Sequence, residues 1–166
     1  FIKLENFMIL SDSELIEMLR EPRTRREGFA VLVKQYSEKL YWKVRRIVLS
    51  HEDANDVLQN VFIKVWNNLQ NFQGKSSLST WLYRIAINES LDFLRKQKLA
   101  DKVSADEDVS VASRLMSDEY FDGDEVQARL QEAVARLPEV QRTVFNLKYF
   151  EEMKYSEISQ ILNTSE

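Results

Sequence analysis

Three polar side chains that suit nucleic-acid binding recur at four-residue spacing in the middle of the sequence: Thr80, Arg84 and Asn88. On a helix they would lie one above another on one face, with the aromatic rings of Trp81 and Tyr83 beside them. Phosphates accept hydrogen bonds from cations, whereas unstacked bases bind to amides and rings. The pattern therefore favours a surface for single-stranded nucleic acid, although an ordinary solvated polar face would use the same residues.

The composition predicts that helices position this face. The 166 residues include only 3 Gly and 2 Pro, 44% are hydrophobic and 30% are charged. So few glycines and prolines argue against a β fold, which needs many turns. Long stretches of the sequence consist of strong helix formers. We expect an all-α protein built from two small helical domains.

Apolar residues at spacings of three and four predict the individual helices. Ser11 to Glu14 forms a capping-box pattern, and Ser77 or Ser79 can cap the helix that carries Thr80. Pro138 suits the first turn of a later helix, and Asn163 tolerates the left-handed backbone of a tight turn. The predicted spans are 12–20, 24–50, 53–69, a helix from about 78 to 98, 126–137, 138–150 and 155–162, with a turn near Gly74.

Charge divides the chain into domains. Between Asp101 and Glu125, nine acidic residues stand against Lys102 and Arg114, a net charge of −7 within a total of −4. This stretch lacks an apolar stripe, so we interpret it as an acidic flexible linker; a sharper hypothesis is that it mimics DNA and shields a basic face. The expected divisions are an N-terminal extension with a short helix (1–23), a first domain (24–99), the linker (100–124) and a second domain (125–166).

Several classes of function are excluded or disfavoured. The sequence has no Cys and one His, so we expect no metal, no cofactor and no catalytic residues. No apolar run reaches the length that spans a bilayer and no signal peptide is evident, which favours a cytoplasmic protein.

Other notable side chains have ordinary interpretations. We expect Trp42, Trp66, Trp81 and the pair Tyr149 and Phe150 to lie mostly in the core. The basic run of Lys43, Arg45 and Arg46 reads as a solvated face, and His51 as a capping or exposed residue at a helix junction.

Two sets of motifs follow one another along the chain. The first set comprises Asp53-Ala-Asn-Asp56, Val57-Leu-Gln59, Val61-Phe62, Val65-Trp66, a loop with Phe72 and Gly74, Thr80-Trp81-Leu82 and Ile85-Ala86-Ile87-Asn88. The second set comprises Leu137-Pro138, Gln141-Arg142, Val144-Phe145, Leu147 and Tyr155 to Ile161. In this order the motifs resemble those of sigma factors of the extracytoplasmic-function (ECF) type, in the sigma-70 family: the first set resembles the sigma2 domain and the second resembles the start of the sigma4 domain.

The resemblance implies a function in transcription initiation and assigns roles to particular residues. The helix from Asp53 to Leu69 would dock on the clamp helices of the largest subunit of core RNA polymerase, through Asp56, Gln59 and Asn60, with Val57, Val61 and Phe62 in the core. The loop 72–77 would take a flipped base from the minus-ten element of promoter DNA, which costs a few kcal/mol of stacking and pairing. The single-strand contacts would come from Gln73, Lys75, Ser76, Arg84 and Asn88.

In the second domain, the helix 155–162 resembles the first helix of a helix-turn-helix, which supports a recognition helix in the major groove. The sequence ends at Glu166, where that recognition helix would begin, so we expect this stretch alone to lack minus-35 binding. The resemblance also implies an anti-sigma factor as a partner. The competing hypotheses are a dimeric regulator that binds duplex DNA without polymerase and a helical anti-sigma or adaptor module that does not open DNA.

Overall fold

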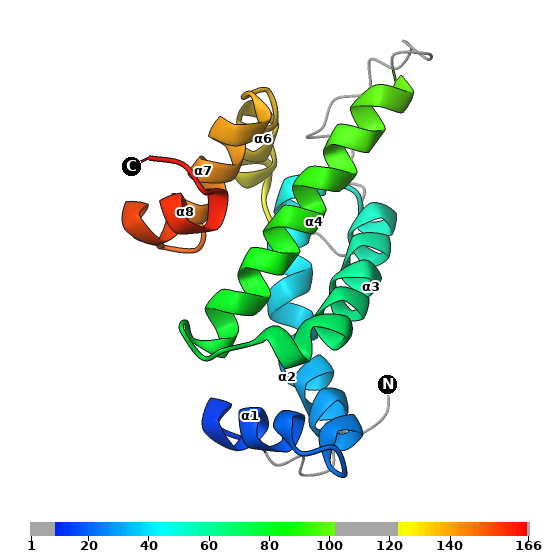
Figure 1. The fold of residues 1–166 in the computed structure, drawn as a ribbon. Helices are drawn as coiled ribbons and strands as arrows, with labels where there is room; N and C mark the ends of the chain where they lie inside the picture. The colour runs from blue at the N-terminus through cyan, green and yellow to red at the C-terminus, as the bar shows by residue number, and fades with distance from the viewer. Residues whose placement is uncertain (1–8, 102–122, 166) are drawn as a thin grey trace.

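The computed structural model describes residues 9–101 and 123–165, which form helices and connecting turns with no strand among them (Figure 1). The all-α prediction is confirmed. Residues 1–8 of the predicted extension and residues 102–122, most of the acidic stretch to which DNA mimicry was assigned, lie outside the described residues.

Helices α1 to α4 form the N-terminal bundle. They span Asp12–Arg20 (α1), Arg25–Val48 (α2), His51–Asn68 (α3) and Leu78–Asp101 (α4), and a short 3-10 helix, η1 (Leu69–Asn71), follows α3. The bundle core is built from side chains that are 2% exposed or less: Leu15, Leu32, Leu40, Val44, Ile47, Ala54, Val57, Val61, Val65, Leu78, Leu82, Ala86 and Ile87. Burial of each large aliphatic side chain stabilises the fold by about 1.5 to 3 kcal/mol, so the packing of α2, α3 and α4 sets the position of α4.

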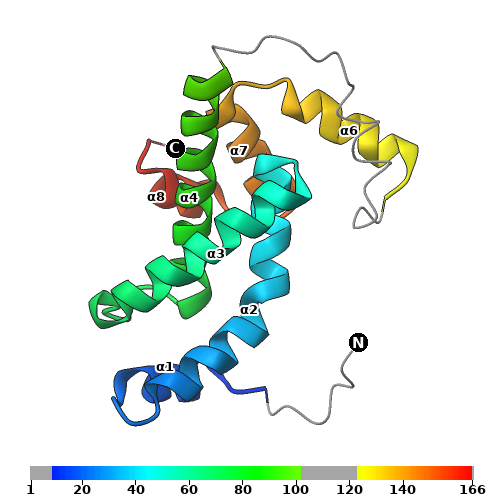
Figure 2. The ribbon, with the colours of Figure 1, turned by 90° about the vertical axis from the view of Figure 1, so that its right-hand side faces the viewer.

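Helix α1 packs across the N-terminal half of α2 (Figure 2). The predicted capping box is present: the Ser11 hydroxyl accepts from the Glu14 amide at 3.3 Å, and the Glu14 carboxylate accepts from the Ser11 amide at 2.8 Å. The Tyr36 hydroxyl donates to Asp12 at 2.7 Å. At Gly28 the backbones come so close that an added Cβ would stand 2.9 Å from the Cβ of Met18. Helix α1 is therefore part of the bundle rather than a loose extension.

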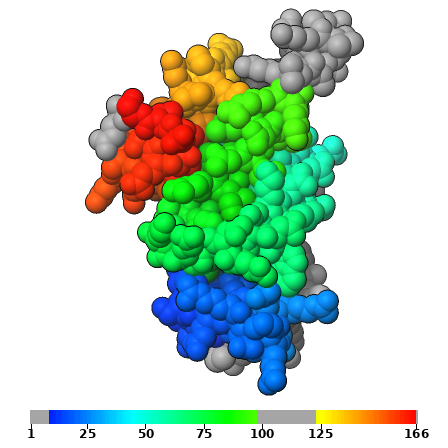
Figure 3. All heavy atoms as spheres, viewed as in Figure 1, coloured from blue at the N-terminus to red at the C-terminus, as the bar shows by residue number. Residues whose placement is uncertain are grey.

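Helices α6 (Glu125–Ala135), α7 (Glu139–Tyr149) and α8 (Tyr155–Leu162) form the C-terminal unit. Asn163 adopts the predicted left-handed backbone, with φ of 52°, and ends α8. The C-terminal unit lies against the N-terminal bundle: α7 contacts α2, and α8 contacts α4 (Figure 3). Leu147, Ile158 and Ile161 belong to the same buried apolar cluster as the bundle core.

Several interpretations of single residues are wrong. Lys43 and Arg45 are 8% and 5% exposed, so the basic run of α2 is not a solvated face: α1, α3, α4 and α7 all pack on α2 and cover more than one side of it. Tyr149 is 66% exposed, and Trp66 is 39% exposed. His51 is half-buried, with Nδ1 2.7 Å from the Tyr41 hydroxyl, and Ser50, not His51, caps α3.

Candidate nucleic-acid and polymerase interface

The loop between η1 and α4 is held at both ends and exposed at its tip. The Phe72 and Trp81 rings lie 5.0 Å apart, which ties the start of the loop to the first turns of α4. Gly74 has φ of +70°, a backbone that costs residues with a Cβ about 1 to 2 kcal/mol. Gln73 and Lys75 are exposed beside it, and Ser76 is half-buried. The loop thus presents an amide and an ammonium group on a backbone fixed by ring contact.

The first turn of α4 carries a cluster of hydroxyl groups. The Ser77 hydroxyl accepts from the Thr80 amide at 3.1 Å, which makes Ser77 the cap between the two serines that the sequence allowed. The same hydroxyl lies 2.9 Å from Oγ1 of Thr80 and 3.1 Å from Oγ of Ser79. A capped helix start adjoining the loop fixes the direction in which α4 leaves it.

Along α4 the predicted polar line is present but unevenly exposed. Thr80 and Arg84 are half-buried, whereas Asn88 is exposed. The Nε atom of Arg84 is buried and finds no acceptor among the described residues. A buried donor without a partner costs about 1 to 3 kcal/mol, so the Nε atom of Arg84 is an unfavourable feature of the first half of α4. The exposure of these polar side chains therefore increases along α4, from the half-buried Thr80 to the exposed Asn88.

Helix α3 presents a separate outward face. Asp56, Gln59 and Asn60 are all exposed, and Val57 and Val61 are buried on the opposite side. The predicted polymerase-binding residues therefore share one accessible surface, and two of the three residues assigned to the core are fully buried. Phe62, the third, is partly buried.

Two apolar residues extend this face, and the sequence reasoning did not assign them to it. Ile63 is 58% exposed and Trp66 is 39% exposed, and they continue the spacing of three and four from Asp56 and Gln59. The Trp66 ring lies 5.0 Å from the ring of Phe29 on α2, which holds it in place. A combined apolar and polar patch on one helix is typical of a protein-binding surface. Their spacing from Asp56 and Gln59 indicates both positions, but the general preference of aromatic residues for the core favours a buried position for Trp66.

The first turn of α3 carries an acidic residue, Asp53, whose pKa is shifted. Burial raises the pKa of Asp53, against the lowering effect of its hydrogen bond with Ser50. Lys64 of α3 pairs with Glu89 of α4, which ties the two helices to each other. The outward face of α3 and the polar line on α4 thus belong to one bundle.

The described residues contain no cluster of His and acidic side chains able to hold a metal ion, and none of their helices has both the length and the apolar character to cross a membrane.

Comparison with known proteins gives one consistent family. Residues 32–100 match Sigma-70 region 2, and residues 127–166 match Sigma-70, region 4. The chain is 34% identical over 146 residues to the ECF RNA polymerase sigma factor SigW of Bacillus subtilis, covering 82% of this chain and 78% of that protein. It is 32% identical over 160 residues to the RNA polymerase sigma-H factor of Pseudomonas aeruginosa, covering 91% and 82%.

Two solved structures share the fold. The sigma factor RpoE of Bartonella quintana, crystallised with the anti-sigma factor NepR, superposes with a TM-score of 0.65 at 21% identity, covering 84% of this chain and 85% of that one. CnrH, in complex with the cytosolic domain of CnrY, superposes with a TM-score of 0.63 at 22% identity, covering 93% and 84%. Region 2 falls on the N-terminal bundle and region 4 on the C-terminal unit. The chain belongs to the ECF group of the sigma-70 family: it is a sigma factor, not an enzyme, and it directs RNA polymerase to promoters.

Proposed function

We propose that the loop 72–77 and helix α4 capture the non-template strand of the minus-ten element and so couple recognition to melting. The observation that carries this proposal is the exposed loop tip at Gln73 and Lys75, fixed by the Phe72 and Trp81 ring contact. A flipped base needs a preformed receptor, because the few kcal/mol lost on unstacking must be offset at once.

Arg84 and Asn88 continue this receptor along α4. The half-buried Arg84 side chain supplies a guanidinium group that donates to a phosphate or a base edge beside α4. The exposed Asn88 amide offers both a donor and an acceptor to a splayed base. Ser76, half-buried between the tip and the Ser77 cap, contributes a hydroxyl group to the loop wall.

The outward face of α3 docks on the clamp helices of the largest polymerase subunit. Asp56, Gln59 and Asn60 supply the polar contacts, and Ile63 and Trp66 supply apolar area. Interface binding energy concentrates in buried aromatic and aliphatic anchors surrounded by polar residues, which is the composition of this face.

The proposed domain limits are 24–99 for the polymerase- and strand-binding domain, 100–124 for the linker and 125–166 for the upstream-binding domain. The N-terminal extension 1–23 carries α1, which packs on the first domain. The protein acts in the cytoplasm, where polymerase meets chromosomal DNA. An anti-sigma factor is a further partner, by extension from the two structural relatives, which were solved with NepR and CnrY.

Strand capture is tested by measuring how holoenzyme binds a fork-junction DNA with a single-stranded minus-ten overhang. Lys75→Ala removes one phosphate contact, so the slope of log affinity against log salt falls by about 0.7. Asn88→Ala lowers affinity without changing this slope. Gln70→Ala and Lys154→Ala, which alter exposed residues away from the loop tip, leave both quantities unchanged. Equal behaviour of all four variants would refute strand capture by this loop.

Polymerase docking is tested separately by a pull-down with core polymerase. The double variant Asp56→Ala and Gln59→Ala loses binding, whereas Glu38→Ala with Gln70→Ala retains it, because Glu38 is exposed on α2 outside the outward face of α3. Unchanged binding of the first pair would refute the assignment.

A further inference from the structure

The C-terminal end of α1 reaches the loop to which the proposed function assigns the captured strand. Atom Nη2 of Arg20 lies 3.8 Å from the point at which a Cβ would stand on Gly74, at the tip of the loop 72–77. Helix α1 also contacts η1, which precedes the loop, and Figure 3 shows the surface of α1 adjoining the segment that leads into α4. The side chain of Arg20 is exposed, like those of Gln73 and Lys75. The loop tip is therefore bordered by a guanidinium group from a different element.

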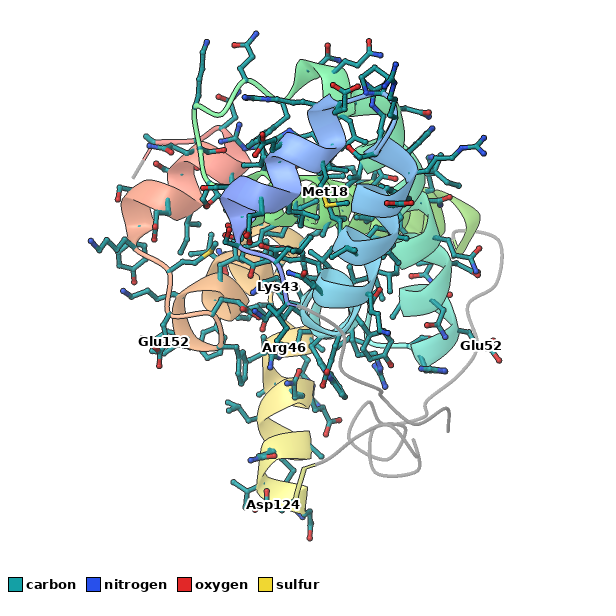
Figure 4. All side chains as sticks on the ribbon, turned by 90° about the horizontal axis from the view of Figure 1, so that it is seen from below. Met18, Lys43, Arg46, Glu52, Asp124 and Glu152 are labelled. Carbon is teal, nitrogen blue, oxygen red and sulfur yellow. The ribbon has the colours of Figure 1, made fainter. Side chains whose placement is uncertain are left out.

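Hydrogen bonds fix the backbone that carries the Arg20 side chain. The Thr24 hydroxyl donates to the carbonyl of Met18 at 2.9 Å, and Met18 lies where α1 faces α2 (Figure 4). Atoms Nε and Nη2 of Arg25 donate to the carbonyls of Leu19 and Arg20, at 3.0 and 3.3 Å. The last carbonyl groups of a helix have no partner within it, and these bonds satisfy them. The end of α1 thus has a set position relative to the loop, and only the rotamers of the Arg20 side chain adjust.

The charge of Arg20 is available to an anionic ligand. Neither Arg20 nor Lys75 forms an ion pair with a carboxylate in the part of the chain that the structure describes. Glu17 and Glu21 are exposed near Arg20 in the sequence, so the surface is mixed rather than uniformly basic. A guanidinium group presents a planar fork of donors that matches a phosphate, and it keeps its charge. An anionic chain that lies along the loop contacts Lys75 on the loop and Arg20 beside it.

A second explanation of Arg20 requires no ligand. Arg20 occupies the last turn of α1, where a cation interacts favourably with the helix dipole. That interaction depends on the charge at the end of the helix and not on the position of the side chain beside Gly74. The two explanations differ in what they predict for DNA binding, because only a phosphate contact changes the dependence of affinity on salt.

We propose that Arg20 binds a phosphate of the captured strand beside the loop 72–77, which makes α1 part of the strand-binding surface. The inference rests on the proposed function of the loop, and it extends that function to a helix outside residues 32–100, the part of the chain that matches Sigma-70 region 2. Phosphate contacts fix the register of a bound strand, whereas base contacts supply sequence specificity. Because α1 is fixed on α2, the contact at Arg20 determines which base of the strand arrives at the loop.

The dependence of affinity on salt tests the contact in the assembled holoenzyme. The probe is a fork-junction DNA with a single-stranded minus-ten overhang and no minus-35 element, cut from a fragment that the holoenzyme selects. Arg20→Gln lowers the slope of log affinity against log salt by about 0.7, the value for one phosphate of a single strand. Arg20→Lys, which keeps the charge, keeps the slope. The matched control Arg129→Gln removes the same charge from an exposed position on α6, in the C-terminal unit, and leaves the slope unchanged.

Methylphosphonate substitution identifies the phosphate. Each charged phosphate of the overhang is replaced in turn by a neutral methylphosphonate. The wild-type holoenzyme loses affinity about tenfold when the phosphate that Arg20 binds is replaced. Arg20→Gln shows no further loss at that position and keeps the losses at the others, and Lys75→Ala becomes insensitive at a different phosphate. Such non-additivity marks a direct contact, because the effects of independent sites add.

The outcomes separate this contact from the strand capture on which it rests. An unchanged slope for Arg20→Gln with a lowered slope for Lys75→Ala would overturn the Arg20 contact and leave strand capture by the loop intact. Unchanged slopes for both variants would overturn strand capture as well. Weaker binding by Arg20→Gln with an unchanged slope and a lower Tm would assign Arg20 to the stability of α1 alone, which also overturns the phosphate contact.

Discussion

The substitution Gly28→Ala sets a gain in helix propensity against a steric clash with α1. It therefore tests how closely α1 packs on α2. Gly28 lies inside α2, where alanine is favoured over glycine by about 0.8 to 1.0 kcal/mol. The new Cβ would stand 2.9 Å from the Cβ of Met18, 3.2 Å from its carbonyl carbon and 3.3 Å from the amide nitrogen of Leu19. These atoms belong to the backbone or to the base of a side chain, so α1 must move as a unit. Overpacking of this kind costs about 1 to 3 kcal/mol.

The clash therefore outweighs the gain in helix propensity, and we expect a net destabilisation of about 1 kcal/mol. For a protein of this size that lowers the Tm by about 2 to 4 °C. Differential scanning calorimetry measures the shift, and hydrogen exchange at Leu15, whose amide donates to Ser11 at 2.9 Å, reports whether α1 has loosened. A Tm higher than that of the wild type would refute the close packing of α1 on α2.

Three further predictions follow from the described contacts. Ser77→Ala removes the cap of α4 and costs about 1 kcal/mol, measured by urea denaturation. Ile63→Ser changes stability by less than about 0.5 kcal/mol but weakens core-polymerase binding about tenfold, measured by surface plasmon resonance; equal binding would remove Ile63 from the interface. The amide and hydroxyl of Ser11 hold the pKa of Glu14 below its ordinary 4.5. Because this folded-state pKa is depressed, the capping box stabilises α1 above pH 4.5 and fails as the pH falls through the lowered pKa; in Glu14→Gln, amide exchange at Leu15 loses this acid dependence.

Local signals in the sequence predicted the helices well because the causes are themselves local. The capping box at Ser11 and Glu14 starts α1 where expected, and Asn163 ends α8 with the left-handed backbone assigned to it. The buried stripe of Val57 and Val61 follows from helical spacing alone. The exposure of Gln73, Lys75 and Asn88 agrees with their predicted placement on a surface, while their roles stay predictions.

Contacts between distant parts of the chain escaped the sequence reasoning. Glu151 and Lys43 are 108 positions apart, and no periodicity in either segment points to the other. The prediction of a solvated basic face on α2 was wrong because an apolar stripe identifies only one buried face of a helix, whereas several helices cover α2. Trp66 and Tyr149 are exposed because their positions turn away from the core, which residue type alone does not reveal.

Promoter opening by the assembled holoenzyme is the most direct test of the central assignment. Duplex DNA fragments selected by this protein together with core polymerase would be probed with permanganate, which oxidises unpaired thymines. We predict reactive thymines in the minus-ten element only when both components are present, and a loss of reactivity with Lys75→Ala combined with Asn88→Ala. Reactivity without polymerase, or full reactivity with the double variant, would contradict strand capture by the loop 72–77 and α4.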